Sequence, residues 1–288
     1  ATWTPWPGNG TPRTSEGHAD ERSTMTCNIV YRTDAIAEYF SKHRRTWDEF
    51  YPSERFVFER VGAERNSAGR DGFGHVLDVG CAAGGLAAAL PERFSVASYT
   101  GVDINAQAVA AARQARDIGI EAVFHEGDIT GRMDLPAAAY DTVFNLSCAD
   151  WNVDFRGILA ATWRHVAPGG TMILSLRMTD GDSVTDMSES FQYIQFSGTE
   201  PSETAERAAY IVLNITEALG LLGELEPAPA GMLAYGYWGR PSAMARTPFG
   251  RILFSVVALL RPYDDGRQAA AGPPRVELHL PWTAWRRS

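Results

Sequence analysis

The chain has 288 residues, 45% of them hydrophobic, which is enough apolar material for one large domain with a sizeable core. Its formal net charge of −9 argues against a broad nucleic-acid-binding face. Three widely separated cysteines, Cys27, Cys81 and Cys148, favour neither a disulfide scaffold nor a zinc site, so we expect no metal.

The first segment of the chain is expected to precede the main sheet. Residues 1–26 are rich in Pro, Gly, Thr and Ser and lack hydrophobic periodicity, which predicts a flexible leader without a signal peptide. Helical patterns follow over residues 34–40, 44–50 and 52–61. We therefore expect residues 27–65 to form a helical lid.

Strand and helix signals alternate from residue 75 onward. This alternation predicts βαβ units, with a mostly parallel sheet and helices on both faces. The strand candidates are residues 75–79, 98–103, 121–125, 142–146 and 171–177. The helix candidates are residues 85–90, 106–118 and 155–166.

The last third of the chain is expected to complete this sheet. A long amphipathic helix is predicted over residues 201–225, and two apolar runs at 232–238 and 252–260 predict paired edge strands. A short strand is predicted over 276–280. The longest apolar run, 252–260, falls short of the roughly 20 residues that span a bilayer, so we expect a cytoplasmic protein without membrane contact.

Polar residues follow successive strand candidates at their carboxyl ends. The first candidate ends at Asp78 and the glycine-rich turn Gly80-Cys81-Ala82-Ala83-Gly84-Gly85, the second ends at Asp103, the third at Asp128 and the fourth at Asn145. Ligands of open α/β sheets bind beyond these strand ends. Because glycine lets the backbone approach a ligand closely, the turn predicts a site for an adenosine-containing cofactor.

The segment Leu77-Asp78-Val79-Gly80-Cys81-Ala82-Ala83-Gly84-Gly85 resembles the first motif of class I S-adenosylmethionine-dependent methyltransferases. The stretch Val166-Ala167-Pro168-Gly169-Gly170-Thr171 resembles the turn before their fifth strand. The resemblance implies a Rossmann-like fold over residues 70–262, whose seven-stranded, mostly parallel sheet ends in an antiparallel hairpin, with 263–288 as an extension. Ala82 stands where the family usually has glycine, and it allows the same close approach if its φ is negative.

The resemblance also implies S-adenosylmethionine as the cofactor. Asp78 would orient its amino group, Asp103 would bind both ribose hydroxyls, and Asp128 would accept from the adenine amino group. Ile104 and Ile129 would contact the adenine ring. The full set of implied cofactor contacts is Asp78, Gly80, Cys81, Ala82, Gly84, Asp103, Ile104, Asn105, Gly127, Asp128, Ile129, Asn145, Leu146, Ser147, Trp151, Trp47 and Tyr51.

A nicotinamide-binding domain is the alternative interpretation of the turn. Gly80, Ala82 and Gly85 fit G-x-G/A-x-x-G, and Asp103 follows about 20 residues later, where a ribose-binding acid is expected. Asp78, however, is awkward beside a pyrophosphate, Asp128 adds a second acid, and no arginine or lysine follows the turn. These features favour methyl transfer over an NAD(P)-dependent oxidoreductase.

The acceptor side is less defined by the sequence. Asp150 and Asn152 after the fourth strand, and His43 in the lid, are candidate catalytic residues; a base is needed only for a hydroxyl or a protonated amine. Asp154 is the better helix cap, which leaves Asp150 for the acceptor. Candidate substrate contacts are Arg177, Tyr235, Tyr237 and Trp238, and packing at the edge of the sheet is the alternative that accounts for at least half of these aromatic residues.

We therefore expect methyl transfer to an oxygen or nitrogen atom of a small polar or anionic molecule, such as a sugar or a natural-product intermediate. The acidic balance disfavours a nucleic-acid partner. A protein or tRNA methyltransferase and a non-catalytic cofactor-binding protein remain alternatives, and the chain is expected to act as a monomer or homodimer.

Overall fold

The computed structural model describes residues 45–194, 206–264 and 274–285. The predicted leader over residues 1–26, the predicted helix over 34–40 and the candidate base His43 lie outside the described residues.

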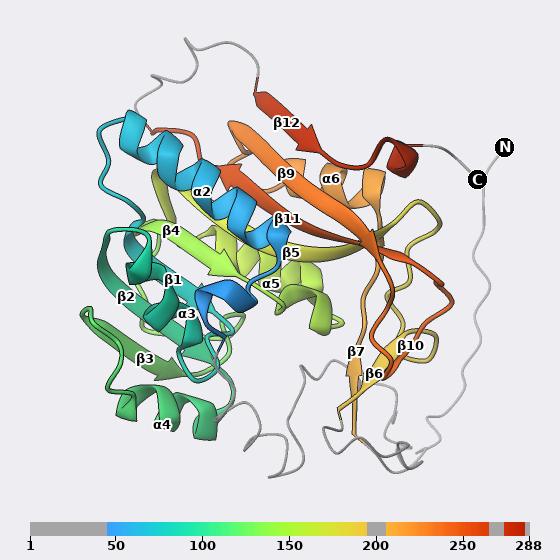
Figure 1. Cartoon of the computed structure of the whole chain (residues 1–288), viewed down its shortest axis with the longest axis horizontal. Coiled ribbons are helices and arrows are strands. Elements are labelled where there is room, and N and C mark those ends of the chain that lie inside the picture. The colour runs from blue at the N-terminus through green and yellow to red at the C-terminus, as the bar shows by residue number, and fades with distance from the viewer. Residues whose placement is uncertain (1–44, 195–205, 265–273, 286–288) are drawn as a thin grey trace, which may run out of the picture.

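A nine-stranded sheet forms the centre of the described part of the chain (Figure 1). Its order is β3-β2-β1-β4-β5-β11-β9-β12, and the short β8 pairs with β5. The strands are β1 (Gly74–Val79), β2 (Val96–Asp103), β3 (Ala122–Glu126), β4 (Tyr140–Asn145), β5 (Val166–Thr179), β8 (Leu213–Asn214), β9 (Gly231–Gly239), β11 (Ile252–Leu260) and β12 (Arg275–His279).

The pairing confirms the predicted fold class. β1 to β5 are mutually parallel, whereas β11 runs antiparallel to both β5 and β9. These are the predicted parallel strands and the predicted antiparallel hairpin. β8 and β12 join the sheet in addition, each parallel to its neighbour.

Helices cover both faces of the sheet (Figure 1). The helices on one face are α2 (Pro52–Ser67), α3 (Gly85–Ala89) and α4 (Ala106–Gln114). Those on the other are α5 (Phe155–Trp163) and α6 (Ile215–Gly223). Short 3-10 turns are η2 (Trp47–Glu49), η3 (Leu90–Glu92), η4 (Ala149–Trp151) and η5 (Trp282–Trp285).

Successive side chains along each strand point to opposite faces of the sheet and pack into two separate hydrophobic cores. In β1, Val76 packs toward α2 and α3, and Leu77 packs toward α5 and α6. In β4, Phe144 and Val143 divide in the same way. Because both faces are buried, the strands are almost continuously apolar, as is typical of a parallel sheet.

Capping side chains fix where the helices begin. Asn105 accepts hydrogen bonds from Gln107 N–H and Ala108 N–H at the start of α4. Asp154 accepts from Gly157 N–H at the start of α5, which confirms its predicted capping role. Helix α4 ends at Gln114, earlier than predicted, and the described part of the predicted helix over 44–50 contains the single turn η2 rather than a longer helix.

A second, three-stranded sheet lies beyond the carboxyl ends of β1 and β4 (Figure 1). It consists of β6 (Phe191–Tyr193), β7 (Arg207–Ala209) and β10 (Ala245–Arg246), in the order β10-β6-β7. We call this sheet with its adjoining loops, residues 180–194, 206–213 and 240–250, the cap.

The predicted helix over residues 201–225 is wrong. Within its described part, β7 and β8 come first, and α6 begins only at Ile215. Residues 208–213 are all buried, and Val212 pairs with Val184 while Leu213 pairs with Met178. A continuous apolar run that is buried on all sides suits an extended segment. In a surface helix, about half of these residues would lie on the exposed face.

None of the described helices combines the length and the apolar character needed to cross a lipid bilayer.

Candidate cofactor and acceptor site

The glycine-rich turn leaves β1 in a conformation that glycine favours. Gly80 has φ +82° and Gly84 has φ +77°, both in the left-handed region. Gly80 N–H and Cys81 N–H both donate to Val102 O of β2, at 2.8 and 3.1 Å. A Cβ on Gly80 would lie 3.0 Å from the Cβ and Sγ atoms of Cys148, so a larger residue would collide with the η4 segment as well.

Ala82 departs from the expectation of a negative φ. Its φ is +44°, a left-handed value that costs an L-residue roughly 1–2 kcal/mol. Its N–H donates to Asp103 Oδ2 at 2.8 Å, which ties the turn to the end of β2. This hydrogen bond helps to hold the strained residue in place.

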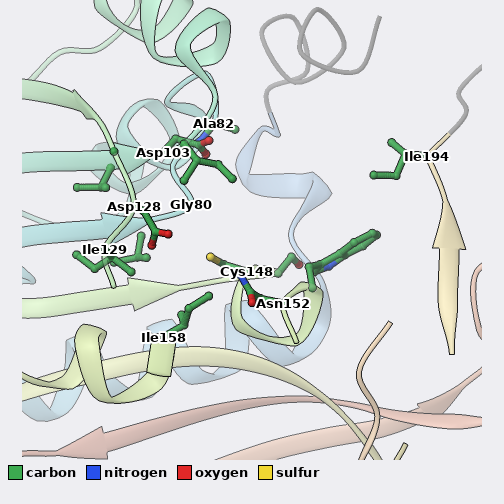
Figure 2. A pocket seen from close by; sticks show the side chains of 15 residues that line it. Gly80, Ala82, Asp103, Asp128, Ile129, Cys148, Asn152, Ile158 and Ile194 are labelled. Carbon is green, nitrogen blue, oxygen red and sulfur yellow. The ribbon is translucent and has the colours of Figure 1, made fainter. Parts of the chain in front are cut away.

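A first cavity opens beyond the carboxyl ends of β1, β2 and β3. Figure 2 shows Ile194, from the cap, on the opposite side from Gly80, Asp128 and Ile129. The lining residues are Val79, Gly80, Ala82, Val102, Asp103, Ile104, Gly127, Asp128, Ile129, Ser147, Cys148, Trp151, Asn152, Ile158 and Ile194.

Two carboxylates lie in this cavity (Figure 2). Asp103 also accepts from Asn105 N–H at 2.8 Å, and burial raises its pKa although its backbone hydrogen bonds oppose the rise. Asp128 Oδ1 accepts from the N–H and the hydroxyl of Thr130, at 2.9 and 2.7 Å. Both side chains are therefore oriented before any ligand arrives.

Asp78 is placed differently from the other two acids. It is 4% exposed, accepts a hydrogen bond from the Tyr99 hydroxyl and does not line the cavity. Burial raises the pKa of Asp78 to about 7. Its predicted contact with a cofactor amino group stays a prediction.

The structure gathers about half of the predicted cofactor residues around the first cavity. Those that line it are Gly80, Ala82, Asp103, Ile104, Gly127, Asp128, Ile129, Ser147 and Trp151. Those that do not are Asp78, Cys81, Gly84, Asn105, Asn145, Leu146, Trp47 and Tyr51.

Several of the remaining predicted residues have structural contacts instead. Asn105 caps α4, and Asn145 accepts from Ala149 N–H at 3.0 Å and donates to Thr162 at 3.1 Å. Trp47 is 5% exposed and packs among aromatic rings, including Phe50 and Phe94. The types and spacing of these residues in the sequence do not show whether they contact a ligand or only other residues of the protein.

Sequence reasoning missed some lining residues of the first cavity. Cys148 faces Gly80 because η4 passes beside the turn, and Ile158 reaches the cavity from the first turns of α5. Ile194 comes from the cap, far along the chain from the turn. The apolar periodicity of residues 155–163 was a signal for Ile158, but no motif marks Ile194.

A second cavity of about 580 Å³ adjoins the first and shares Ser147 and Trp151 with it. Ser147 has φ +49°, so a non-glycine residue in the left-handed region lies where the two cavities meet. The lining residues are Tyr51, Ser53, Glu54, Ser147, Asp150, Trp151, Ser175, Leu176, Arg177, Gln192, Tyr210, Tyr237, Gly239, Arg240, Ser242, Phe254, Ser255 and Val256.

Three of the predicted acceptor-side residues, Asp150, Arg177 and Tyr237, line this second cavity. Asn152 lines the first cavity, where its Oδ1 accepts from Asp154 N–H at 2.8 Å. Tyr235 and Trp238 line neither cavity.

The contacts of these two aromatic residues explain their positions. The Tyr235 ring lies 4.7 Å from the ring of Phe56, measured between centroids. Trp238 donates its indole N–H to Thr283 at 2.9 Å. Both therefore take part in packing around β9.

Two ion pairs organise the charged residues of the second cavity. Arg177 Nε donates to Asp150 Oδ2 at 2.7 Å, and both side chains are only 5% exposed. Arg45 donates to both oxygens of Glu54, at 3.0 and 2.9 Å. Each carboxylate that lines the second cavity is thus paired with an arginine.

Comparison with known proteins gives consistent matches. Residues 76–170 match the family model described as a methyltransferase domain. A trans-aconitate 2-methyltransferase of Azoarcus sp. (strain BH72) is 32% identical over 134 residues, covering 46% of this chain and 51% of the relative. A ubiquinone biosynthesis O-methyltransferase of Cronobacter sakazakii (strain ATCC BAA-894) is 31% identical over 146 residues, covering 49% of this chain and 59% of the relative.

The chain thus spans between half and three-fifths of the length of these two relatives. Among solved structures, the N-methyltransferase NodS from Bradyrhizobium japonicum WM9 is 14% identical, with a TM-score of 0.47 and coverage of 79% of this chain and 97% of that one. The strand order, rather than this distant similarity, establishes the fold. Residues 76–170 of the chain are thus similar to a methyltransferase domain and include most of β1 and all of β2, β3 and β4 of the parallel part of the sheet.

Proposed function

We propose that this chain is an enzyme that transfers a methyl group from S-adenosylmethionine to an oxygen or nitrogen atom of a small polar molecule. The observation that carries the proposal is the pair of adjoining cavities, which share Ser147 and Trp151. The first cavity would hold the cofactor and the second the acceptor. Two reactants could then meet at the shared wall.

The residues of the first cavity fit this cofactor. Ile104 and Ile129 offer apolar surface to an adenine ring, while Asp103 and Asp128 offer acceptors to ribose hydroxyls and an amino group. Among the described residues that line it there is neither arginine nor lysine. A dinucleotide would find no cation for its diphosphate there, which favours S-adenosylmethionine over NAD(P).

Bound S-adenosylmethionine would supply an electrophilic methyl carbon: an acceptor lone pair forms the new bond as the carbon–sulfur bond breaks, and its electrons stay on sulfur. The protein's own part is alignment and exclusion of water, which can supply much of the rate enhancement. Asp150 Oδ2 is already engaged by Arg177, so we assign Asp150 to holding that arginine rather than to taking a proton. An acceptor that loses a proton would release it to solvent.

Ligand-induced stabilisation tests the cofactor half of the proposal. S-adenosylhomocysteine at 100 times its Kd should raise the free energy of unfolding by about 2.7 kcal/mol, seen as a higher Tm. Asp103→Ala should weaken its binding about tenfold or more in calorimetry, because hydrogen bonds to a charged group are lost. Asp71→Ala, an exposed acid before β1, is the matched control and should bind normally.

Three other outcomes would count against the proposal. A Tm shift with NAD and none with S-adenosylmethionine would indicate an oxidoreductase. Cofactor binding without methylation of any small molecule would indicate a binding protein, and methylation confined to proteins or tRNA would overturn the acceptor class.

A further inference from the structure

We propose that the acceptor is a small, planar carboxylic acid whose carboxylate binds Arg177 in the second cavity, while a hydroxyl or amine of the same molecule donates to Asp150. This inference rests on the proposed function, because it names the class of molecule that enters the acceptor cavity.

The Arg177 guanidinium is held by several contacts, and one of its three nitrogen atoms has no hydrogen-bond partner among the described residues. Nε donates to Asp150 Oδ2 at 2.7 Å and Nη2 donates to the Asp150 carbonyl at 2.8 Å. The guanidinium carbon lies 3.8 Å from the ring centroid of Tyr210 and 4.7 Å from that of Trp151. Nη1 is buried and has no hydrogen-bond partner among the described residues.

An unpaired donor of this kind needs an explanation. A buried polar group without a partner destabilises a fold, and more so when it is charged, so such groups are rare. Arg177 is 4% exposed and lines the second cavity. A ligand acceptor is the partner that would satisfy Nη1, and a carboxylate is the acceptor that guanidinium binds best.

The charge balance of the cavity agrees with an anionic ligand. Glu54 is already neutralised by Arg45, and Asp150 by Arg177. Arg240 at the rim is exposed and forms no ion pair with any described residue. Counted over the described residues, the cavity therefore keeps one uncompensated positive charge, which attracts a negatively charged molecule.

Asp150 adds a second requirement to the ligand. Its Oδ1 is also buried without a partner in the described part of the chain. A carboxylate oxygen accepts hydrogen bonds only, so the matching ligand group is a hydroxyl or an amine. One molecule with a carboxylate and such a donor would satisfy both unpaired atoms.

The walls of the cavity indicate a flat ligand body. Tyr51 and Phe254 are stacked at 6.5 Å with an interplanar angle of 23°, and Tyr237 lies 5.9 Å from Phe254. Aromatic walls of this kind pack well against a planar ring or an unsaturated chain. A volume of about 580 Å³ suits a single small molecule.

The test uses probes of defined charge. Binding of 2-hydroxybenzoate, 4-hydroxybenzoate and 4-hydroxycinnamate to the S-adenosylhomocysteine-loaded protein is measured by calorimetry, each beside its methyl ester, which removes the charge and keeps the ring and hydroxyl. At least one acid should bind ten times more tightly than its ester. Arg240→Gln should reduce this preference several-fold, whereas Arg246→Gln, an exposed cap arginine outside the cavity lining, should leave it unchanged.

A second variant guards against misfolding. Arg177→Gln alone leaves Asp150 buried without its cation, so Arg177→Gln is combined with Asp150→Asn, which replaces the ion pair by two neutral amides. The double variant should bind S-adenosylhomocysteine normally and show equal affinity for acid and ester.

The failures are distinguishable. If the wild type does not bind S-adenosylhomocysteine, the proposed function is overturned. Normal S-adenosylhomocysteine binding with equal affinity for acids and esters, or with no acid bound at millimolar concentration, would overturn only the carboxylate assignment.

Discussion

Asp103 accepts hydrogen bonds from the backbone N–H groups of Ala82 and Asn105, so a single carboxylate fixes both the glycine-rich turn and the start of α4. The same side chain faces the first cavity. A ligand that contacts Asp103 thus meets a group whose orientation is already set. Preorganisation of this kind reduces the entropy lost on binding.

The left-handed backbone of Ala82 leads to a prediction about stability. Ala82→Gly should raise the free energy of unfolding by about 0.5–1 kcal/mol, because relief of the positive-φ strain exceeds the added freedom of the unfolded chain. Urea denaturation measures the change. Ala83→Gly, at the next position, which is buried without a positive φ, is the control and should lower stability. A loss of stability in the Ala82 variant would show that its conformation is not strained.

The buried carboxyl of Asp78 predicts a pH-dependent stability. Its folded-state pKa of about 7 lies above the ordinary value of 3.8, so the folded protein keeps a proton that the unfolded chain has released. The contribution of Asp78 to the free energy of unfolding should therefore fall as pH rises from about 4 to about 7, and stay constant above that. Asp78→Asn should remove this fall in urea denaturation at a series of pH values.

Tyr99→Phe provides the matched test for the same group. The Tyr99 hydroxyl donates to Asp78 and lowers its pKa, so removing the hydroxyl should extend the falling phase to higher pH. Parallel pH profiles for the wild type and the Asp78 variant would contradict the assignment of this titration to Asp78.

Residues near each other in the chain were the ones that the sequence could identify. Asp103 and Asp128 follow apolar runs directly, so the local sequence pattern was enough to predict that they lie at the ends of strands. The pairing of Asp150 with Arg177 joins residues 27 positions apart and depends on how η4 packs against β5. That packing has no local signature, so the sequence alone did not predict this ion pair.

Helix α2 is fastened to the sheet by one buried arginine. Arg65 donates through Nε to Gly72 O at 2.6 Å and through Nη1 to Asp141 O at 3.3 Å, and it forms an ion pair with the Asp141 carboxylate at 3.3 Å. Its side chain is 6% exposed. These contacts join the end of α2 to the segment before β1 and to β4.

Removing this arginine should destabilise the protein measurably. Arg65→Ala should lower the free energy of unfolding by about 2–3 kcal/mol, because one buried and one partly buried carbonyl lose their donor and the carboxylate loses its cation. Arg55→Ala, on the same helix, breaks only an exposed ion pair and should change stability by less than about 0.5 kcal/mol. Equal effects of the two substitutions in urea denaturation would contradict this role of Arg65.

Among the elements, the parallel strands were predicted best. Each of β1 to β5 is an apolar run bounded by turn residues, and burial on both faces reinforces that local signal. The prediction failed at residues 201–225, where the helical spacing of α6 was extended backward through β7 and β8. Extended segments that pair with distant strands carry little periodicity of their own, so tertiary pairing decided their conformation.

Across the whole molecule, the first and second cavities draw on different parts of the chain. Apart from Ile194, the described residues that line the first cavity come from the range 79–158, which lies within the matched methyltransferase domain. The second cavity takes most of its lining from β5, β9, β11, the cap and the start of α2. Motifs therefore identified the first cavity from the sequence, whereas the second depends on how distant segments assemble.

This division has a practical consequence for redesign. Among the described residues of the cap, Ile194 alone lines the first cavity. Exchanging cap loops between proteins of this fold, with Ile194 retained, should therefore change which molecules are accepted without rebuilding the methyl-donor side. In evolutionary terms, such an arrangement lets the two halves diverge at different rates.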